Sequence, residues 1–388
     1  MTQRTRVFAV YAFGFVLLGA GTNTFGVAWP SLADEMGRSI GELGYITLAY
    51  GAGYTLSSLL SGRMAARSKV SSLLISAAVT STAALATLAI SPKWIVFLLA
   101  TMILGFAGGQ IDSATNTYVA VRHGARAMGL IHGSFGVGAI IGPLLVTMLL
   151  YAGLSWRVAF GLLAAGQLLY ASGLWRFTRS VDVPSGTAQP RETPGHLWSP
   201  TLVWSIAVFF IYAGVASGFG AWTFTFLTEE RGMGDTTGGL VVTAYWIGFT
   251  SSRLLLGAVG NRIDPHRLLR ASAMATIAGA AVFWWSPGMW VGILALLFAG
   301  FAHGPVFPLE MLLTAERFGG SLAAAVVGFE IAAANVGFAS VPGFIGLFVD
   351  RFGLAIIPAV LLVAALVLWG AIEMLRASAT RATAVRAD

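Results

Sequence analysis

The chain has 388 residues, of which 57% are hydrophobic and only 10% charged, and its mean hydropathy is +0.80. This balance lies outside that of soluble domains and favours an integral membrane protein. The formal net charge of +7 does not indicate nucleic-acid binding, because the basic residues are scattered between apolar runs, and the absence of cysteine excludes disulfides, thiolate metal sites and thiol redox chemistry.

Six apolar segments, each long enough for a membrane-spanning helix, occupy the first half of the chain. None alternates in the manner of a barrel strand, so the sequence predicts helices. No small-residue cleavage pattern follows Arg4 and Arg6, so we expect the first segment to be retained as a span. The segments lie at residues 7–29, 41–62, 70–91, 94–121, 126–151 and 156–177.

A polar, proline-rich stretch from Thr178 to Pro200 interrupts this pattern and is typical of a linker. Six further apolar segments follow it, at 201–227, 236–259, 266–286, 288–315, 320–349 and 353–375. The expected organisation is a six-helix half at 1–177, a cytoplasmic linker at 178–200, a second six-helix half at 201–377 and a cytoplasmic tail at 378–388.

The basic residues also indicate how the chain lies in the membrane. With a cytoplasmic N-terminus, the outer segments hold only Arg38, Lys93, Arg157, Arg231 and Arg351, and nearly all other basic residues fall on the inner side. This asymmetry follows the positive-inside rule. We therefore expect a multi-pass protein of the cytoplasmic, or inner, membrane with both termini in the cytoplasm.

The two halves contain an internal repeat. A shift of 195 positions superposes Ala49-Tyr50, Gly53, Gly62 and Arg67 on Ala244-Tyr245, Gly248, Gly257 and Arg262, and it superposes Gly105-Phe106-Ala107 on Gly300-Phe301-Ala302. A shift of 199 aligns Gly129, Gly138 and Pro143 with Gly328, Gly337 and Pro342. Glycines and loop arginines in register predict two pseudo-symmetric six-helix bundles of the same orientation, with a solute site between them.

The loop motif that occurs in both halves is typical of a known protein family. It occurs as Gly62-Arg63-Met64-Ala65-Ala66-Arg67-Ser68-Lys69 and again at Gly257 to Arg262. With the twelve expected helices, it resembles the major facilitator superfamily, over nearly the whole chain. The resemblance implies gating roles for Gly62, Arg63, Arg67, Gly257 and Arg262, although Ala66 and Asn261 stand where the family motif has aspartate.

Within that superfamily the chain resembles the fucose-permease-like sugar porters, through Gly108-Gly109-Gln110-Ile111-Asp112-Ser113-Ala114-Thr115-Asn116-Thr117-Tyr118 and through 129–143. The resemblance implies that Asp112 takes up a proton and that Asn23 and Asn116 line the cavity. Gly26 stands where proton-coupled members carry an aspartate, which is a departure from their pattern.

The residues themselves support a role for Asp112. A carboxylate within a span costs about 2.5–3.5 kcal/mol on insertion scales and normally faces a partner or a watery cavity. Asn116 lies one helical turn further on the same face. A structural carboxylate bonded to a neighbouring helix is the alternative. His132 either forms a proton relay with Asp112 or caps a helix end, and the pattern leaves both open.

The second half offers further candidates. His303 and Glu310 share one face of the segment at 288–315, which Pro305 and Pro308 are expected to kink. Glu330 and Asn335 lie in the next segment, and Arg253 lies within 236–259, where snorkelling or an ion pair with Glu310 is expected. Structural or gating roles compete with solute contact for all of these residues.

The sequence therefore predicts a secondary transporter that moves a small polar solute, a sugar, by alternating access, with proton coupling. The alternative is a proton-antiporting exporter of drug-like compounds or metabolites. Neither a membrane enzyme nor a channel is favoured, because catalytic clusters are lacking and the pseudo-symmetry is built into one chain. We expect a monomer in the lipid bilayer, without a cofactor or metal.

The candidate substrate-binding residues are Asn23, Tyr50, Asp112, Asn116, His132, Tyr212, Trp222, Tyr245, Trp246, His303 and Asn335. For the aromatic residues among them, a packing role competes with solute binding. The candidate proton-coupling residues are Asp112, His132, Glu310 and Glu330.

Overall fold

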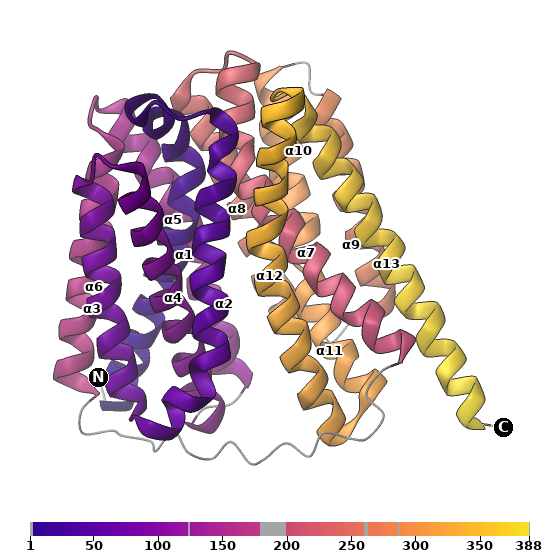
Figure 1. Cartoon of the computed structure of the whole chain (residues 1–388). Coiled ribbons are helices and arrows are strands. Elements are labelled where there is room, and N and C mark those ends of the chain that lie inside the picture. Colours follow the sequence, from indigo (N-terminus) through magenta and orange to yellow (C-terminus); the bar gives the residue numbers. More distant parts are fainter. Residues whose placement is uncertain (1–2, 123–124, 179–198, 260–262, 286–287, 388) are drawn as a thin grey trace.

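The computed structural model describes residues 3–122, 125–178, 199–259, 263–285 and 288–387, and these ranges are helical with short turns and no strand. The thirteen α-helices of the described residues form two bundles (Figure 1). The first bundle holds α1 (Gln3–Met36), a short turn η1 (Ile40–Glu42), α2 (Leu43–Arg67), α3 (Val70–Ile90), α4 (Trp94–Arg122), α5 (Ala125–Tyr151) and α6 (Trp156–Phe177).

The second bundle begins with α7 (Pro200–Thr225), which continues as the π-helical turn η2 (Phe226–Glu230). It then holds α8 (Asp235–Val259), α9 (Pro265–Trp285), α10 (Met289–His303), α11 (Val306–Phe318), α12 (Gly320–Phe352) and α13 (Ile356–Ala387). The expected all-α fold with two six-helix halves is confirmed. Most of the expected linker, 179–198, lies outside the described residues.

Three segments differ from their expected bounds. The α1 helix passes through Pro30 and continues to Met36, because Leu32 and Ala33 are fully buried and hold this last stretch in the bundle. The segment expected at 288–315 is two helices, α10 and α11, separated at Gly304 and Pro305, where proline removes a backbone donor. Residues expected as a tail from 378 onward continue α13.

Eleven segments of the described chain are long and apolar enough to cross a membrane, with α10 and α11 counted as one. The remaining long helix is α2, whose 25 residues span about 37 Å. Its lower hydropathy comes from small and polar residues such as Gly51, Gly53 and Ser57. These residues let neighbouring helices approach α2 closely, so α2 completes a set of twelve spans.

The matching glycines lie at the same helix crossings in both halves. A Cβ atom at Gly105 in α4 would overlap the backbone oxygen of Tyr50 in α2, and a Cβ at Gly300 in α10 would overlap that of Tyr245 in α8. Both residues of the second pair lie 195 positions after those of the first. The internal repeat is therefore also a repeat of packing. The same shift relates Gly53 with Met102 to Gly248 with Leu297, and Gly109 with Ser57 to Gly304 with Ser252.

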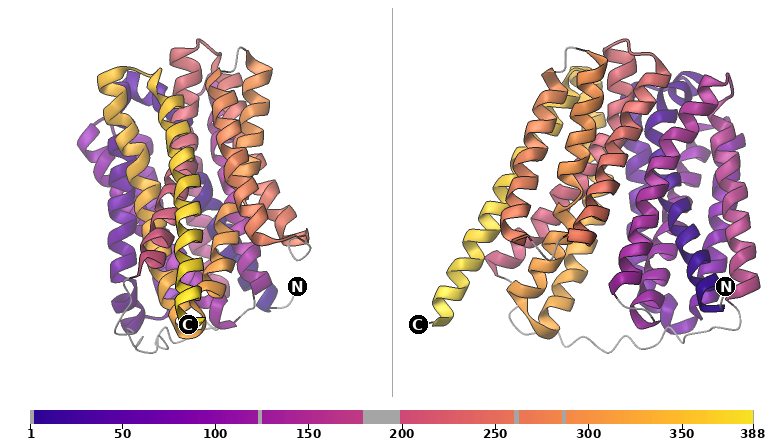
Figure 2. Two further views of the ribbon diagram at one scale, coloured as in Figure 1. Left: turned by 90° about the vertical axis from the view of Figure 1, so that its right-hand side faces the viewer. Right: turned by 180° about the vertical axis from the view of Figure 1, so that it is seen from behind.

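The two halves meet chiefly along α2 with α12 and α5 with α8, and α1 also packs against α7. Both chain termini lie at the lower end in Figure 1, which we call the termini side, and we call the opposite end the distal side. The bundles lie close together at the distal side and diverge towards the termini side, as the view from behind in Figure 2 also shows.

Close contacts hold the halves together at the distal side. The Ser39 hydroxyl group before η1 donates a hydrogen bond of 3.0 Å to Oδ1 of Asp350 at the end of α12. A Cβ at Gly44 would lie 2.7 Å from the backbone oxygen of Gly343, so α2 and α12 cross almost backbone to backbone. The distal side is thus closed in this conformation.

Candidate functional site

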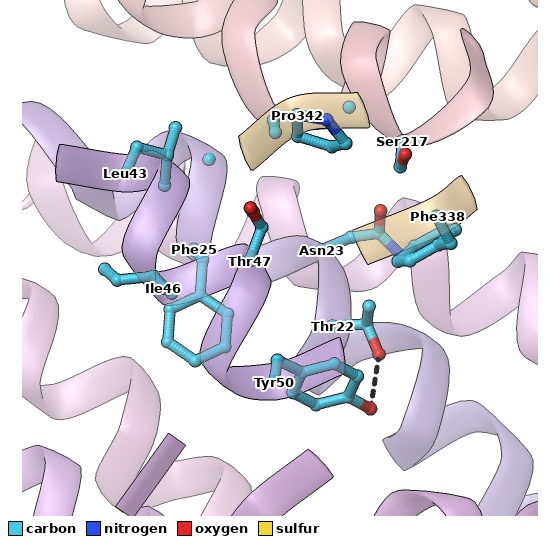
Figure 3. A pocket seen from close by; sticks show the side chains of 13 residues that line it. Thr22, Asn23, Phe25, Leu43, Ile46, Thr47, Tyr50, Ser217, Phe338 and Pro342 are labelled. Carbon is cyan, nitrogen blue, oxygen red and sulfur yellow. Dashed lines mark hydrogen bonds between the residues drawn. The ribbon is translucent and has the colours of Figure 1, made fainter. Parts of the chain in front are cut away.

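A pocket lies between the two halves and is lined by α1, α2, α7 and α12 (Figure 3). The first half contributes Thr22, Asn23 and Tyr50, and the second contributes Ser217 and Phe338. The hydroxyl groups of Thr22 and Tyr50 are 3.2 Å apart and hydrogen-bonded. This pocket therefore offers hydroxyl and amide groups beside aromatic and aliphatic side chains, which suits a small solute with mixed polarity.

A second pocket adjoins the first and shares Thr22, Tyr50 and Phe338 with it. It adds Tyr54 of α2 and Asn335 of α12, so it too is lined by both halves. Of the eleven candidate substrate-binding residues, Asn23, Tyr50 and Asn335 line these two pockets.

The candidate proton-coupling residue Asp112, in α4, lies in a cluster of polar side chains. The amide nitrogen Nδ2 of Asn116 donates a hydrogen bond of 3.0 Å to Oδ1 of Asp112, as the spacing of one helical turn requires. The Tyr54 side chain of α2 and His132 of α5 both interact electrostatically with this carboxylate. Because Tyr54 also lines the second pocket, one side chain connects the pocket with the carboxylate.

His132 is positioned by packing as well as by charge. Its ring makes an edge contact with Phe15 of α1, with the ring centres 5.8 Å apart. It also interacts electrostatically with Arg253 of α8, in the other half. His132 therefore lies between the carboxylate of the first half and a guanidinium group of the second, which favours the relay hypothesis over helix capping.

Arg253 belongs to a polar cluster in the second half. Its Nη2 donates 2.7 Å to the Tyr212 hydroxyl group, its Nε donates 3.1 Å to the backbone oxygen of Gly304, and its guanidinium carbon lies 4.3 Å from the ring centre of Phe249. The Tyr212 ring stacks on His303 with centres 4.4 Å apart, and His303 Nε2 donates to the backbone oxygen of Tyr212.

Three aromatic candidates pack inside the second half and line neither pocket. Trp222 is fully buried and donates its ring N–H to the backbone oxygen of Pro342, 2.9 Å away. Tyr245 stacks on Phe219, and Trp246 packs edge-on against Tyr245. Trp246 also lies beside Gly220 of the first pocket, so it supports the pocket wall.

The two glutamates of the second half form a separate buried cluster. Glu310 pairs with Arg317 at 2.5 Å, and not with Arg253 as expected, because Arg317 follows it by two turns of α11. Glu330 of α12 accepts hydrogen bonds from Ser205 and, at 2.7 Å, from Thr314. One oxygen of each carboxylate is buried without a hydrogen-bond partner in the described part of the chain.

The expected gating residues lie at helix ends. Gly62, Arg63 and Arg67 belong to the last turns of α2, because this helix continues to Arg67 and leaves only Ser68 and Lys69 before α3. The expected loop is thus mostly helical. Gly257 lies near the end of α8, and Arg262 lies outside the described residues.

Several pocket residues were not identified from the sequence, namely Thr22, Tyr54, Ser217 and Phe338. Tyr54 follows Tyr50 by one turn of α2, so helical spacing held a signal for Tyr54. Thr22 is adjacent to Asn23 in the chain, and adjacent residues of a helix do not share a face. No sequence pattern identified Ser217 or Phe338. No group of three or more metal-ligating side chains occurs among the residues described.

Comparisons with known proteins agree on one family. The family model described as Major Facilitator Superfamily matches residues 11–329 and 224–384. Bypass of stop codon protein 6 of Saccharomyces cerevisiae is 23% identical, covering 89% of this chain and 77% of that protein. The glucose/mannose transporter GlcP of Bacillus subtilis is 20% identical, covering 81% and 80%.

Solved structures show the same fold. The nucleoside transporter NupG superposes with a TM-score of 0.75 at 16% identity, over 97% of this chain and 99% of that one. A D-xylose-proton symporter superposes with a TM-score of 0.73 at 16% identity, over 95% and 98%.

Proposed function

The chain belongs to the major facilitator superfamily of membrane transporters, which are not enzymes, and on that premise we propose that it carries a small polar solute, a sugar, across the cytoplasmic membrane by alternating access. The observation that carries this proposal is the pocket between the halves, to which Thr22, Asn23 and Tyr50 contribute from one side and Ser217 from the other. A solute bound there contacts both halves, so its release requires them to separate.

Proton coupling through Asp112 is part of the proposal. Its carboxylate is linked to Asn116, Tyr54 and His132, and Tyr54 also lines the second pocket. A proton gained or lost at Asp112 changes the charge beside the solute, which is how one binding event can bias the other. Glu310 and Glu330 remain candidates for a second proton site, because each has a buried oxygen without a partner among the described residues.

The chain's orientation is also a proposal. Both termini lie on one side of the structure (Figure 1), as an even number of spans requires, and the positive-inside rule assigns that side to the cytoplasm. In that orientation the closed distal side faces outward, and the conformation is inward-facing. We propose a monomer, because the pocket between the halves is formed within one chain.

An exporter of cationic drug-like compounds needs an acidic group to receive the cation, and the glutamates of the second half are the candidates for it. Glu310 is instead paired with Arg317, Glu330 is bonded to Ser205 and Thr314, and neither lines the two pockets. A sugar also suits the neutral hydroxyl and amide groups of the first pocket better than a cation does. GlcP, a relative over most of its length, is by name a glucose/mannose transporter.

Uptake of labelled sugars into proteoliposomes, with and without an imposed pH gradient, tests this proposal. We expect gradient-driven accumulation in the wild type. Asp112→Asn should abolish accumulation while retaining exchange of solute across the membrane, because an amide cannot carry the proton. Glu316→Gln is the matched control, since this exposed glutamate at the end of α11 lies outside the pockets. Sugar accumulation that persists in Asp112→Asn would contradict coupling through Asp112, and no sugar flux at all would favour the exporter.

A further inference from the structure

Arg253 is a cation within a membrane span that has no acidic partner. In the described part of the chain no carboxylate lies within ion-pair distance of it, whereas Arg157, Arg270 and Arg317 each have one. Among the described residues, its hydrogen bonds go to two uncharged groups, the Tyr212 hydroxyl group and the Gly304 backbone oxygen. Charged residues in spans are costly and are normally paired or directed at a watery path. Arg253 therefore lacks the counter-charge that its position demands.

The guanidinium group also has spare donors. It has five N–H groups in a planar fork, and two of them are used by Tyr212 and Gly304. Arg253 remains partly exposed, as do His132 and Asp112 on the opposite half. An incoming group with two acceptor oxygens can thus reach the fork without displacing a protein ligand.

The groups around Arg253 are neutral or basic. Arg253 interacts electrostatically with His132, Tyr212, Tyr245 and His303. Asp112 of the first half accepts a hydrogen bond from Asn116 and interacts with Tyr54 and His132, so it has partners of its own. Positive charge is thus uncompensated on the second half's side of the site.

We propose that Arg253 binds the carboxylate of the transported solute, so that the solute is a sugar acid and not a neutral sugar. This inference rests on the proposed transport function and specifies its substrate class. Arginine recognises a carboxylate through two parallel hydrogen bonds, and the aromatic ring of Phe249 beneath the guanidinium holds its plane in place. Arg253 itself lines neither pocket, but it interacts with His132, which interacts with Asp112 beside Tyr54 of the second pocket. The hydroxyl groups of the sugar acid are then left for the amide and hydroxyl side chains of the two pockets.

The test compares sugar acids with their neutral counterparts, glucuronate with glucose and galacturonate with galactose, on the full-length protein. Uptake into proteoliposomes and the thermal stabilisation of the purified protein are measured for each compound. We expect each acid to be preferred over its neutral counterpart, and Arg253→Gln to reduce this preference by at least about tenfold, the effect of losing hydrogen bonds to a charged group. Arg253→Lys, which keeps the charge but loses the fork, should retain part of the preference.

Arg267→Gln is the control for the loss of one positive charge, because Arg267 is exposed outside the pockets. Transport of neutral sugars without their acids, or an acid preference that survives in Arg253→Gln, would overturn the inference and leave the transport function standing. If Arg253→Gln does not fold, an unchanged acid preference in Arg253→Lys overturns it. Absence of both uptake and stabilisation for every compound would overturn the inference and the proposed sugar transport together.

Discussion

Charged side chains within the spans have different kinds of interaction partners, and these differences suggest different roles. Asp112 interacts with Asn116, Tyr54 and His132 on its own half, whereas Arg253 has only neutral acceptors. Glu310 and Arg317 form an ion pair in which both side chains are almost fully buried, with 1% and 7% of their surface exposed. Asp112 and Arg253 are therefore available to a proton or a solute, whereas Glu310 and Arg317 are buried and paired with each other.

The Glu310–Arg317 pair makes a stability prediction. Arg317→Gln should cost about 3–5 kcal/mol, because removing one partner leaves the buried carboxylate without its counter-charge. The double variant Glu310→Gln with Arg317→Gln should lose less than Arg317→Gln alone, since no unpaired charge remains. Melting curves of the purified protein in detergent measure both.

The exposed pair of Arg267 and Asp264 provides the control, because 89% of the Arg267 side chain is exposed. Arg267→Gln should change stability by less than about 1 kcal/mol. Equal losses in Arg317→Gln and Arg267→Gln would show that burial of the Glu310 pair is not what stabilises it.

The site residues could be predicted only where local spacing determines contact. Asp112 and Asn116 are one turn apart, so their hydrogen bond follows from the sequence. The contact of Arg253 with Tyr212 depends on how α7 and α8 lie relative to each other, which no local pattern encodes. Residue type alone also misleads, because Trp222 has the chemistry of a sugar platform but donates its N–H to the backbone of α12.

At the scale of helices, close crossings determine where each element lies. A Cβ atom at Gly138 in α5 would overlap the backbone oxygen of Val16 in α1, and its counterpart at Gly337 in α12 would overlap that of Phe210 in α7. These crossings fix the helices that line the pocket, since α1, α7 and α12 all contribute to it.

Gly138→Ala should therefore destabilise the protein by about 1–3 kcal/mol, the usual range for overpacking, because backbone atoms cannot move aside as a side chain does. Gly161→Ala is the matched control, since a Cβ there meets nothing within 4 Å. It should leave stability unchanged or raise it by up to about 1 kcal/mol, because alanine is the better helix former. If both variants melt at the same temperature, the crossing is looser than the structure indicates.

The presence of each helix could be predicted from the sequence, but the residues at which it begins and ends could be predicted less well. Continuous apolar runs identified all twelve spans, and polar connections gave most boundaries within a few residues. Pro30 did not end α1, because burial of Leu32 beyond it outweighs the lost backbone hydrogen bond. Conversely, Gly304 and Pro305 together separated α10 from α11.

At the scale of the whole molecule, one packing arrangement is used twice. The glycine crossings of α2 with α4 recur in α8 with α10 after 195 residues, so the repeat visible in the sequence predicted the architecture. The conformation was not predictable in this way, because both halves keep their internal packing when they move relative to each other. The halves are closed at the distal side, where Ser39 contacts Asp350 (Figure 1).

Alternating access requires this distal contact to open in every cycle. The chain has no cysteine, so Ser39→Cys with Asp350→Cys introduces the only thiols and allows a clean cross-link between the halves. Arg38→Cys with Glu42→Cys is the control, because that cross-link ties together only neighbouring residues of the first half. Both positions of the test pair are exposed to an oxidant.

The decisive measurement is uptake into proteoliposomes by the Ser39→Cys, Asp350→Cys variant before oxidation, after oxidation and after reduction, using a labelled compound that the wild type accumulates. Alternating access predicts that oxidation abolishes uptake, that reduction restores it, and that the control pair transports throughout. Full uptake by the cross-linked protein would contradict the account, because solute would then cross the membrane without separation of the two halves at the distal side.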